Sequence, residues 1–453
     1  TVGIHLKGSI GSFRSIDDKP GLTLSFEKFV PQQRFHGLRK FHLNNSVEDA
    51  SYMNELIGSD LFQAAGVPAP RVGHAIVELN GRALGLYVLK EGFAEEFLAR
   101  FFSQPEGNLY DIAREGHDVN EAMEKDFGKG PDDRSDLEAV AAAALEPDLR
   151  RRRQRLDRTL DVERFVSFMA MEILLGHRDG YCLYRNNFRV YQDVDSGRMI
   201  FFPHGMDQMF GNPRAAIQPT MNGLVARAFM EMPEGRAAYR SRCAFLITNV
   251  LNADRISQRI DQTIARLRPA LNREASAALE REGAALKERV AARIIQAEQQ
   301  LQQAPLELLR FESNTVNLST GWQPVDIPEG GRLAQTNTAD GKRALMIRAG
   351  PVTSASWRTK VLLPRGRYLF QGKLKTEGVE RLKFGKNHGA VLKVPIAPSA
   401  RSEPVLGNQA WKTLRAPFEV AESEREVELV CELRAGKGTV WFDREALCLI
   451  RVP

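Results

Sequence analysis

The sequence predicts an α+β protein in two parts: a mixed and largely helical part over residues 1–305, and an all-β part over residues 311–453. Two observations support this division. Short β-like runs with Gly, Pro and Asn turns, interrupted by one helix, make up residues 1–92, and mostly helical sequence follows over 93–305. The helical period then stops, and β-branched and aromatic residues occur in short runs with turn residues about every ten positions, typical of a β-sandwich.

Composition and charge argue against two classes of protein. The chain is 43% hydrophobic and 26% charged, and no apolar run approaches the roughly 20 residues of a membrane helix. Residues from Phe311 onward carry 22 Lys and Arg against 15 Asp and Glu, whereas the preceding residues carry 41 against 42. A near-neutral first part does not suit nucleic-acid binding. The basic run Arg150–Arg153 is flanked by acids, which favours a solvated helix face.

The four cysteines do not identify a redox compartment. No pair has the CxxC spacing of a metal site. Cys431 and Cys448 lie in the same all-β part and could pair if the protein is secreted. They could equally be small buried hydrophobic residues. Thr1 starts inside a strand-like run, so we expect a trimmed chain whose targeting segment lies outside this sequence.

Phosphoryl transfer of the protein-kinase type needs a flexible backbone over the phosphates, a lysine held by an acid, a catalytic aspartate and oxygen ligands for a metal. The first candidate is the loop after the first strand-like run. Its two glycines and two serines allow backbone N–H groups to approach an anion closely. A plain hairpin turn is the alternative. The candidate residues of this loop are Lys7, Gly8, Ser9, Gly11 and Ser12.

The candidate lysine and acid come next. Residues 37–43 resemble a strand that carries Lys40, and residues 49–65 form an amphipathic helix that carries Glu55. We therefore expect Glu55 to point back at Lys40, although two exposed charges would also give this pattern.

A hairpin then leads to a candidate nucleobase site. Strands over residues 73–79 and 83–89 are joined by Asn80-Gly81, a strong hairpin signal. The second strand runs into Lys90-Glu91-Gly92, where a kinase hinge would hold adenine through backbone groups, those of Glu91 included.

The most informative stretch follows residue 161. A helix over residues 162–175, apolar on most sides, should be buried, and it leads into His177-Arg178-Asp179. Asn186 and Asn187 follow, then two strand-like runs, then Asp207. This is the layout of a kinase catalytic loop, metal-binding asparagine and metal-binding aspartate. The three-residue match is weak by itself, but the order of all the parts is seldom accidental.

These motifs together resemble the spore coat protein H (CotH) family of atypical protein kinases, over roughly residues 1–300. The resemblance implies a two-lobed, protein-kinase-like domain in a secreted or cell-surface enzyme. Such an enzyme uses ATP and Mg²⁺ or Mn²⁺ to phosphorylate Ser or Thr hydroxyls of proteins. The matching segments are Lys7-Gly8-Ser9, the strand of Lys40, residues 49–55, 65–70, 80–87 and 107–110, Asp179, Asn186-Asn187, and the surroundings of Asp207.

The resemblance assigns a role to each part. Asp179 would take the hydroxyl proton, Asp207 with Asn187 or Asn186 would bind the metal, and Lys40, held by Glu55, would contact the phosphates. One position departs from the family, since Gly205 stands where many relatives have the first acid of Trp-Asp-x-Asp/Glu. A catalytically weak or inactive scaffold, or an enzyme that transfers AMP instead, is therefore the alternative.

The all-β part resembles the jelly-roll sandwich of carbohydrate-binding modules. Such modules often hold a structural Ca²⁺ through acids near both ends, which Glu312 and Asp443 could supply. A polysaccharide or cell-surface ligand would be the partner. Six basic residues could meet an acidic polysaccharide or form a solvated sheet face: Lys373, Lys375, Arg381, Lys383, Lys386 and Lys393.

All four tryptophans lie in this part. Trp411 and Trp441 have apolar neighbours on their strands, so we expect both in the core. Trp322 and Trp357 are then freer to stack on sugar rings.

Overall fold

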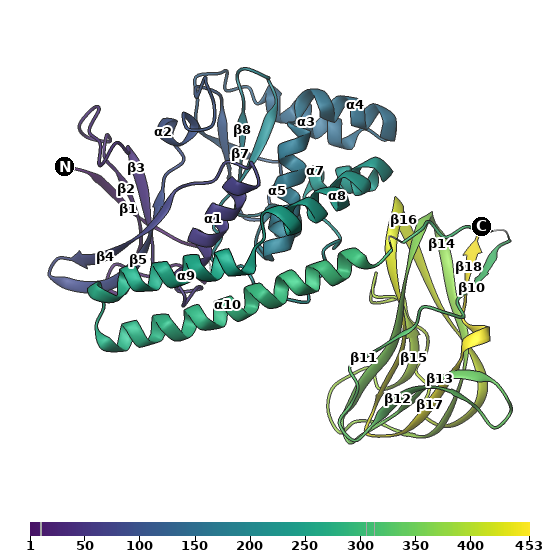
Figure 1. Ribbon diagram of the computed structural model, residues 1–453. Coiled ribbons are helices and arrows are strands. Elements are labelled where there is room, and N and C mark those ends of the chain that lie inside the picture. The colour runs from purple at the N-terminus through teal and green to yellow at the C-terminus, as the bar shows by residue number, and fades with distance from the viewer. Residues whose placement is uncertain (10, 305, 312) are drawn as a thin grey trace. The chain divides into compact units, whose positions relative to one another are not determined.

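A computed structural model describes the whole chain except residues 10, 305 and 312, and gives only the backbone of residues 422–424. The chain divides into two compact units, Thr1–Gln303 and Ala304–Pro453 (Figure 1). The first unit combines sheets and helices, whereas the second is almost entirely β, so the predicted fold class is confirmed. In the described part of the chain, no helix is long and apolar enough to cross a membrane.

The first lobe of unit 1 is an antiparallel five-stranded sheet with the order β1-β2-β3-β5-β4. The hairpin predicted at Asn80-Gly81 is confirmed, because both residues have positive φ, 53° and 76°, as type I′ turns require. The strands are β1 (Gly3–Lys7), β2 (Gly21–Ser25), β3 (Lys40–Asn44), β4 (Val72–Leu79) and β5 (Arg82–Glu91).

Helix α1 (Asn54–Ala64) begins five residues later than the expected start at Asp49. The Asp49 carboxylate accepts hydrogen bonds from the N–H groups of Ser51 and Asn54, at 3.0 and 2.9 Å. Such a side chain satisfies backbone donors that have no partner inside the helix. Asp49 therefore caps the helix from outside.

The second lobe contains a small sheet that the sequence analysis did not predict. β6 (Leu109–Ile112) and β7 (Met123–Phe127) join the expected hairpin of β8 (Phe188–Gln192) and β9 (Met199–Pro203) in the order β7-β6-β8-β9. Strands of four or five residues in a mostly helical stretch leave little periodicity to detect.

The helices of this lobe surround one large core. The buried helix predicted over residues 162–175 is confirmed as α5 (Val162–Leu175). The others are α2 (Glu95–Leu98), α3 (Ser135–Leu145), α4 (Leu149–Thr159), α6 (Tyr181–Tyr184), α7 (Leu224–Glu231), α8 (Pro233–Asn249), α9 (Ala253–Leu267) and α10 (Arg273–Gln302).

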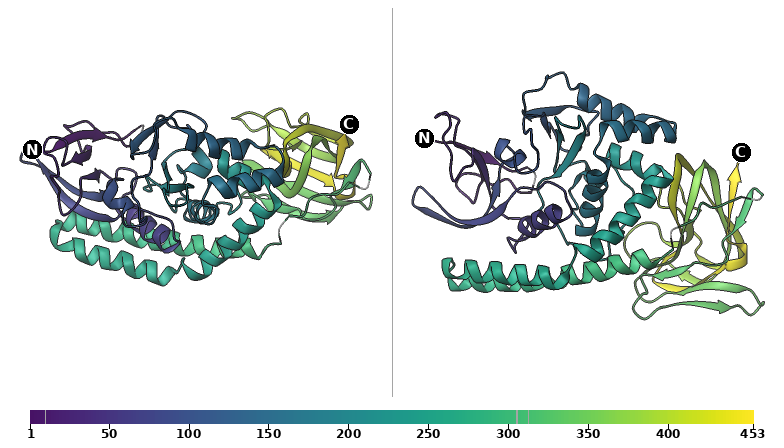
Figure 2. Two further views of the ribbon diagram at one scale, coloured as in Figure 1. Left: turned by 90° about the horizontal axis from the view of Figure 1, so that it is seen from above. Right: turned by 45° about the horizontal axis from the view of Figure 1, so that its top comes forward.

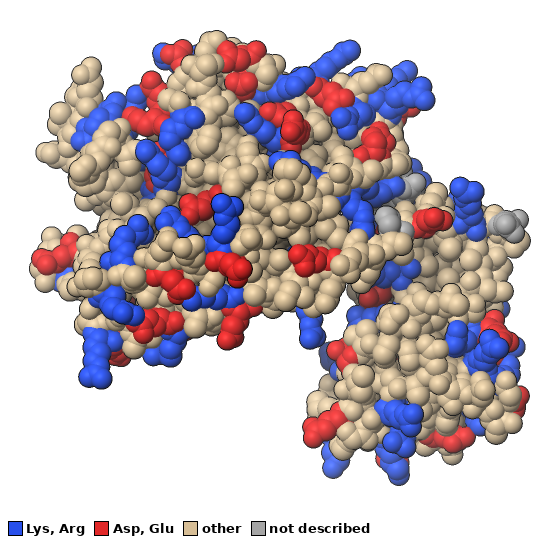
Figure 3. Space-filling model, viewed as in Figure 1, with Lys and Arg blue, Asp and Glu red and all other residues tan. Residues whose placement is uncertain are grey.

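Helices α9 and α10 lie side by side (Figure 2). The buried Arg293 of α10 donates hydrogen bonds to the carbonyls of Ile173 and Leu174, at 2.8 and 2.9 Å. These carbonyls belong to the last turn of α5, whose C=O groups lack partners in the helix. Arg293 thereby fixes the end of α5, from which the site described below extends. On the face shown in Figure 3, acidic and basic side chains are interspersed over this unit.

The described residues of unit 2 form one curled, nine-stranded sheet around an apolar core. Its continuity comes from β14 (Thr353–Glu380) and β16 (Gly407–Ala435), which pair along most of their length. The remaining strands are β10 (Thr315–Asn317), β11 (Gln323–Val325), β12 (Arg332–Asn337), β13 (Arg343–Arg348), β15 (Gly389–Lys393), β17 (Lys437–Asp443) and β18 (Cys448–Val452).

The expectation for the tryptophans is wrong in all four cases. Trp322 and Trp357 are each only 3% exposed and pack in the core. Trp411 and Trp441 are half-buried and lie outside that core. Side chains alternate between the faces of a strand, and Val440 and Phe442 take the inner face, which leaves Trp441 on the outer one.

Of the two alternatives for Cys431 and Cys448, the structure supports unpaired, buried cysteines, and it does not support the expected calcium site. Cys431 and Cys448 are both free and buried. The Asp443 carboxylate receives the ammonium group of Lys342 at 2.7 Å, so a cation already occupies it. Glu312, the other expected calcium ligand, lies outside the described residues.

Candidate active site

A cleft of about 710 Å³ in unit 1 brings together side chains from both lobes. The first lobe supplies residues of β1, β2, β3 and β5, and the second supplies the loops that follow α5 and β9. Among the described residues, no aliphatic side chain lines the cleft. The lining includes Lys7, Gly8, Ser9, Ser12, Thr23, Lys40, His42, Glu48, Glu55, Lys90, Asp179, Asn187, Arg189, His204, Gly205 and Asp207.

Glu55 pairs with Lys90, not with Lys40, so the expected lysine–glutamate pair is wrong in its lysine. Lys90 Nζ lies 2.9 Å from Glu55 Oε1, and the two side chains are only 1% and 2% exposed. Burial opposes ionisation of Glu55, but the charge of Lys90 outweighs it and lowers the pKa of this carboxyl. In protein kinases this lysine lies on the third strand, whereas here it lies at the end of β5.

Lys40 is the first residue of β3, and its Nζ is 3.6 Å from Asp126 Oδ2. The residue of β3 that pairs in register with Lys90 is His42. Lys40 therefore lies two residues along the strand from the position opposite Lys90 and pairs with Asp126, while Glu55 pairs with Lys90. Lys40 still lines the cleft. Lys90 gave a signal in the sequence, since it follows directly on the strand-like apolar run Leu86–Leu89.

The loop after β1 turns sharply over the cleft. Gly8 and Gly11 have φ of 121° and 95°, which favour glycine. The N–H of Phe13 donates to the Ser9 carbonyl at 2.9 Å and closes the turn. Lys7, Gly8, Ser9 and Ser12 line the cleft, and Gly11 lies against the Glu48 carboxylate.

Glu91 does not take the expected place in a nucleobase hinge. Its N–H donates to the Arg71 carbonyl at 2.9 Å, and the Gly92 N–H donates to the Lys40 carbonyl at 3.0 Å. The buried Glu91 carboxylate pairs with Arg71 and Arg100, at 2.9 and 2.6 Å. The expected hinge N–H groups are therefore already used inside the protein.

A buried glutamate shapes the loop that carries Asp179. The Glu172 carboxylate of α5 accepts hydrogen bonds from the N–H groups of Tyr181 and Cys182, at 3.0 and 2.8 Å. His177 Nδ1 lies 3.4 Å from the same carboxylate, and its Nε2 lies 3.1 Å from the Gly205 carbonyl. This network holds the loop after α5 against the segment that follows β9.

The Asp179 carboxylate binds both candidate asparagines. Its Oδ2 accepts hydrogen bonds from Asn186 Nδ2 and Asn187 Nδ2, at 2.8 and 2.9 Å. Burial raises the pKa of the Asp179 carboxyl above its usual value, while the bond from Asn186 opposes this rise.

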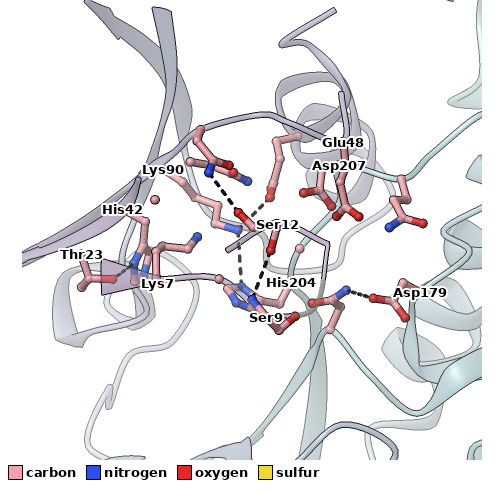
Figure 4. Close-up of a pocket in the computed structure, with 18 of the residues that line it drawn as sticks. Lys7, Ser9, Ser12, Thr23, His42, Glu48, Lys90, Asp179, His204 and Asp207 are labelled. Carbon is pink, nitrogen blue, oxygen red and sulfur yellow. Dashed lines mark hydrogen bonds and ion pairs between the residues drawn. The ribbon is translucent and has the colours of Figure 1, made fainter. Parts of the chain in front are cut away.

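Asp207 lines the same cleft, facing Glu48 (Figure 4). Its backbone carbonyl accepts a hydrogen bond from Asn54 Nδ2 of α1 at 2.6 Å, which ties this segment to the helix of Glu55. Burial, and after it the negative charge of Glu55, raises the pKa of the Asp207 carboxyl to about 6.

The acids of the cleft suit a divalent cation only in part. Within the described residues, no three His, Cys, Asp or Glu side chains converge to hold a metal by themselves. Mg²⁺, however, usually binds to one or two carboxylates together with substrate phosphates. The oxygens of Asp207 and Asn187 fit such a site. Glu55 Oε2 is buried without a partner, which leaves negative charge for a cation to offset.

The position of the missing family acid is filled by a neighbour. Gly205 has φ of 49°, and a Cβ there would collide with the side-chain amide of Asn187. Asn187 thus occupies the space that an acid at position 205 would need. The Asn187 amide also donates a hydrogen bond to the Asp179 carboxylate, so Asn187 connects position 205 with the expected catalytic aspartate.

The sequence analysis missed several polar groups of the cleft. Several of them lie inside recognised segments but gave no separate signal of a site role, and their shared location depends on the pairing of distant strands. These residues are His42, Glu48, Lys90, Asp111, Asp126, Arg189 and His204.

A family model described as CotH kinase protein matches residues 4–311. Inner spore coat protein H of Bacillus subtilis (strain 168) is 22% identical over 262 residues, which cover 53% of this chain and 71% of that protein.

Solved structures match parts of the chain. The Helicobacter pylori proinflammatory kinase CtkA is 10% identical, with a TM-score of 0.31, and the match covers 65% of this chain and 96% of that chain. TmCBM61 in complex with beta-1,4-galactotriose is 17% identical, with a TM-score of 0.23, over 30% of this chain and 91% of that chain.

Proposed function

Because the chain belongs to the CotH kinase family, we propose that it transfers the γ-phosphate of ATP to Ser or Thr hydroxyls of secreted or surface proteins. The observation that carries this proposal is the cleft itself. The buried Lys90–Glu55 pair lies in the same cleft as Asp179 and Asp207, although the four residues come from four separate segments. A structural ion pair alone would not require this convergence.

In this proposal Asp179 accepts the proton of the attacking hydroxyl, and the amides of Asn186 and Asn187 orient its carboxylate. Lys90, rather than Lys40, contacts the phosphates, and Glu55 holds it in place. The loop from Lys7 to Ser12 covers the phosphates. Asp207 and Asn187 would hold Mg²⁺ or Mn²⁺, which neutralises charge on the phosphates when bound.

Phosphate transfer can be tested with γ-labelled ATP, Mn²⁺ and a Ser-rich peptide. We expect label on the peptide with the unaltered protein, and at least about a 100-fold lower rate with Asp179→Asn, because a positioned base contributes about that factor. Asp193→Asn, in an exposed turn away from the cleft, is the matched control. Equal labelling by Asp179→Asn and the control would refute the assignment.

A weak or different phosphotransferase is the second candidate, favoured by Gly205. With one acid fewer than many relatives, the site offers less negative charge to a metal ion. Transfer of label from α-labelled ATP alone would indicate transfer of AMP. If calorimetry shows no nucleotide binding, the non-catalytic scaffold is the remaining hypothesis.

For unit 2 we propose a targeting role through a sugar or surface ligand. The half-buried Trp411 and Trp441 offer aromatic faces outside the core. Lys342 and Lys375 lie over these rings, 5.3 and 5.6 Å from the ring centres. Loss of polysaccharide retention in Trp411→Ala would support this role, because the substitution leaves the core residue Trp322 in place.

A further inference from the structure

The strands of the first lobe form the roof of the active-site cleft, and no described lining residue of these strands has an apolar side chain. Besides Lys40, the strands of the first lobe contribute the lining residues His5, Lys7, Thr23, His42, Asn44 and Lys90. Small-molecule pockets are usually lined mainly by apolar and aromatic side chains. Among the described lining residues, Tyr184 alone has a benzene ring, so a purine ring would find little apolar surface here.

His42 has an unused nitrogen in this roof. The residue is only 7% exposed, and its Nδ1 lies 2.8 Å from the Thr23 hydroxyl. Its Nε2 is buried and has no hydrogen-bond partner among the described residues. Buried polar groups without partners are rare in folded proteins. The side chain lines the cleft, so a bound ligand can supply the missing partner.

The surroundings of His42 are cationic. Burial, together with the charges of Lys7, Lys90, Lys40 and Arg189, lowers the pKa of this imidazole well below its usual value, which keeps it neutral. When the Thr23 hydroxyl donates to Nδ1, the single N–H of the neutral ring stands at Nε2. Nε2 then acts as a donor in a field of positive charge, which suits an anion.

Lys7 adds a second unused donor. No described carboxylate lies within ion-pairing distance of its ammonium group, unlike that of Lys90. Burial, and after it repulsion from Lys90, lowers the pKa of Lys7 to about 8. The Lys7 side chain is half-buried and is repelled by the neighbouring charge of Lys90. An anionic ligand would offset this repulsion.

We propose that this cleft recognises the phosphate chain of a nucleotide rather than its base, and that Lys7 and His42 Nε2 bind phosphate oxygens from the roof. The inference deepens the proposed function and rests on it. Hydrogen bonds to charged phosphate oxygens are about twice as strong as neutral ones. The polar lining gives the base no comparable source of affinity.

A ligand series tests the specificity. Calorimetry with the full chain and Mn²⁺ would compare ATP, GTP, CTP, inorganic tripolyphosphate and adenosine. We expect the four triphosphate ligands to bind within about tenfold of one another, a difference of about 1.4 kcal/mol, and adenosine not to bind. Preference for ATP over the other three by more than that factor would overturn the inference. If the unaltered protein binds none of the five, the proposed function itself fails.

Variants test the part played by His42. We expect His42→Leu to weaken tripolyphosphate and ATP binding by about 10- to 100-fold, since it removes a hydrogen bond to a charged group. His42→Gln, whose amide can donate from nearly the same place, should restore most of the affinity. His388→Leu, in unit 2, is the control. Unchanged affinity in His42→Leu, or no recovery in His42→Gln, would contradict the role.

Thr23→Val keeps the test decisive if His42→Leu does not fold. The valine preserves the shape of threonine but removes the hydroxyl that fixes the imidazole N–H at Nε2. We expect a smaller loss of tripolyphosphate affinity, with the melting temperature preserved. Full affinity in this variant would count against a donor role for Nε2.

Discussion

The buried Lys90–Glu55 pair allows a direct test of which lysine supports the site. Lys90→Met would leave the Glu55 carboxylate buried and unpaired, with its second oxygen already lacking a partner. Breaking a buried ion pair by removing one partner costs about 3–5 kcal/mol of unfolding free energy. Relief of the repulsion between Lys90 and Lys7 offsets part of this cost, so we expect about 3 kcal/mol.

Lys40→Met is the matched control. Lys40 is 25% exposed, and its Nζ lies 3.6 Å from the partly exposed Asp126 carboxylate. Exposed pairs of this kind contribute about 0–1 kcal/mol. The double variant Lys90→Met/Glu55→Gln removes both charges, so it should lose about 2 kcal/mol less than the sum of the single variants.

Urea titration can follow the two units separately. All four tryptophans lie in unit 2, so tryptophan fluorescence reports the unfolding of that unit. Far-ultraviolet circular dichroism reports mainly the helices of unit 1. We expect Lys90→Met to shift the dichroism transition and leave the fluorescence transition in place. A loss below about 1 kcal/mol for Lys90→Met, or an equal loss for Lys40→Met, would refute the reasoning.

Three further predictions concern the other site residues. Asp207→Asn should stabilise the ligand-free protein at neutral pH. The folded state holds a proton at Asp207 more tightly than the unfolded state, with a pKa of about 6, so the stability that this group contributes is lost as pH rises from 3.8 through 6. The same variant should lose metal-dependent nucleotide binding, and unchanged affinity for ATP would contradict the metal assignment. Gly205→Asp should destabilise unit 1 by about 1–3 kcal/mol, because its side chain would collide with Asn187. The double variant Gly205→Asp/Asn187→Ala should recover part of this loss. Equal melting temperatures for the two variants would show that the side chains of residues 205 and 187 do not compete for the same space. Tripolyphosphate affinity should fall as pH rises through about 8, where Lys7 loses its proton. Calorimetry with Lys7→Met should show no such pH dependence. If the affinity of that variant still falls with pH, another group is responsible for the titration.

Much of the fold could be predicted from local sequence. The hairpin at Asn80-Gly81 and the buried helix α5 follow from turn chemistry and periodicity, which act over a few residues. The same local signals placed Asp179 after a buried helix and Asp207 after a hairpin. The strands β6 and β7 were not predicted, because they are too short to show the alternation of a strand within a mostly helical stretch.

What the tertiary structure decided was which side chains meet. Glu55 was recognisable as a helix acid, but its partner depends on β3 lying beside β5, and this pairing puts His42 opposite Lys90. In unit 2 the alternation of strands is visible in the sequence, yet either face of a strand could be the inner one. The packed core selected Trp322 and Trp357 and left Trp411 and Trp441 outside. Local propensity sets the element, whereas partners distant in the chain set the face and the contact, because burial is a property of the assembled core.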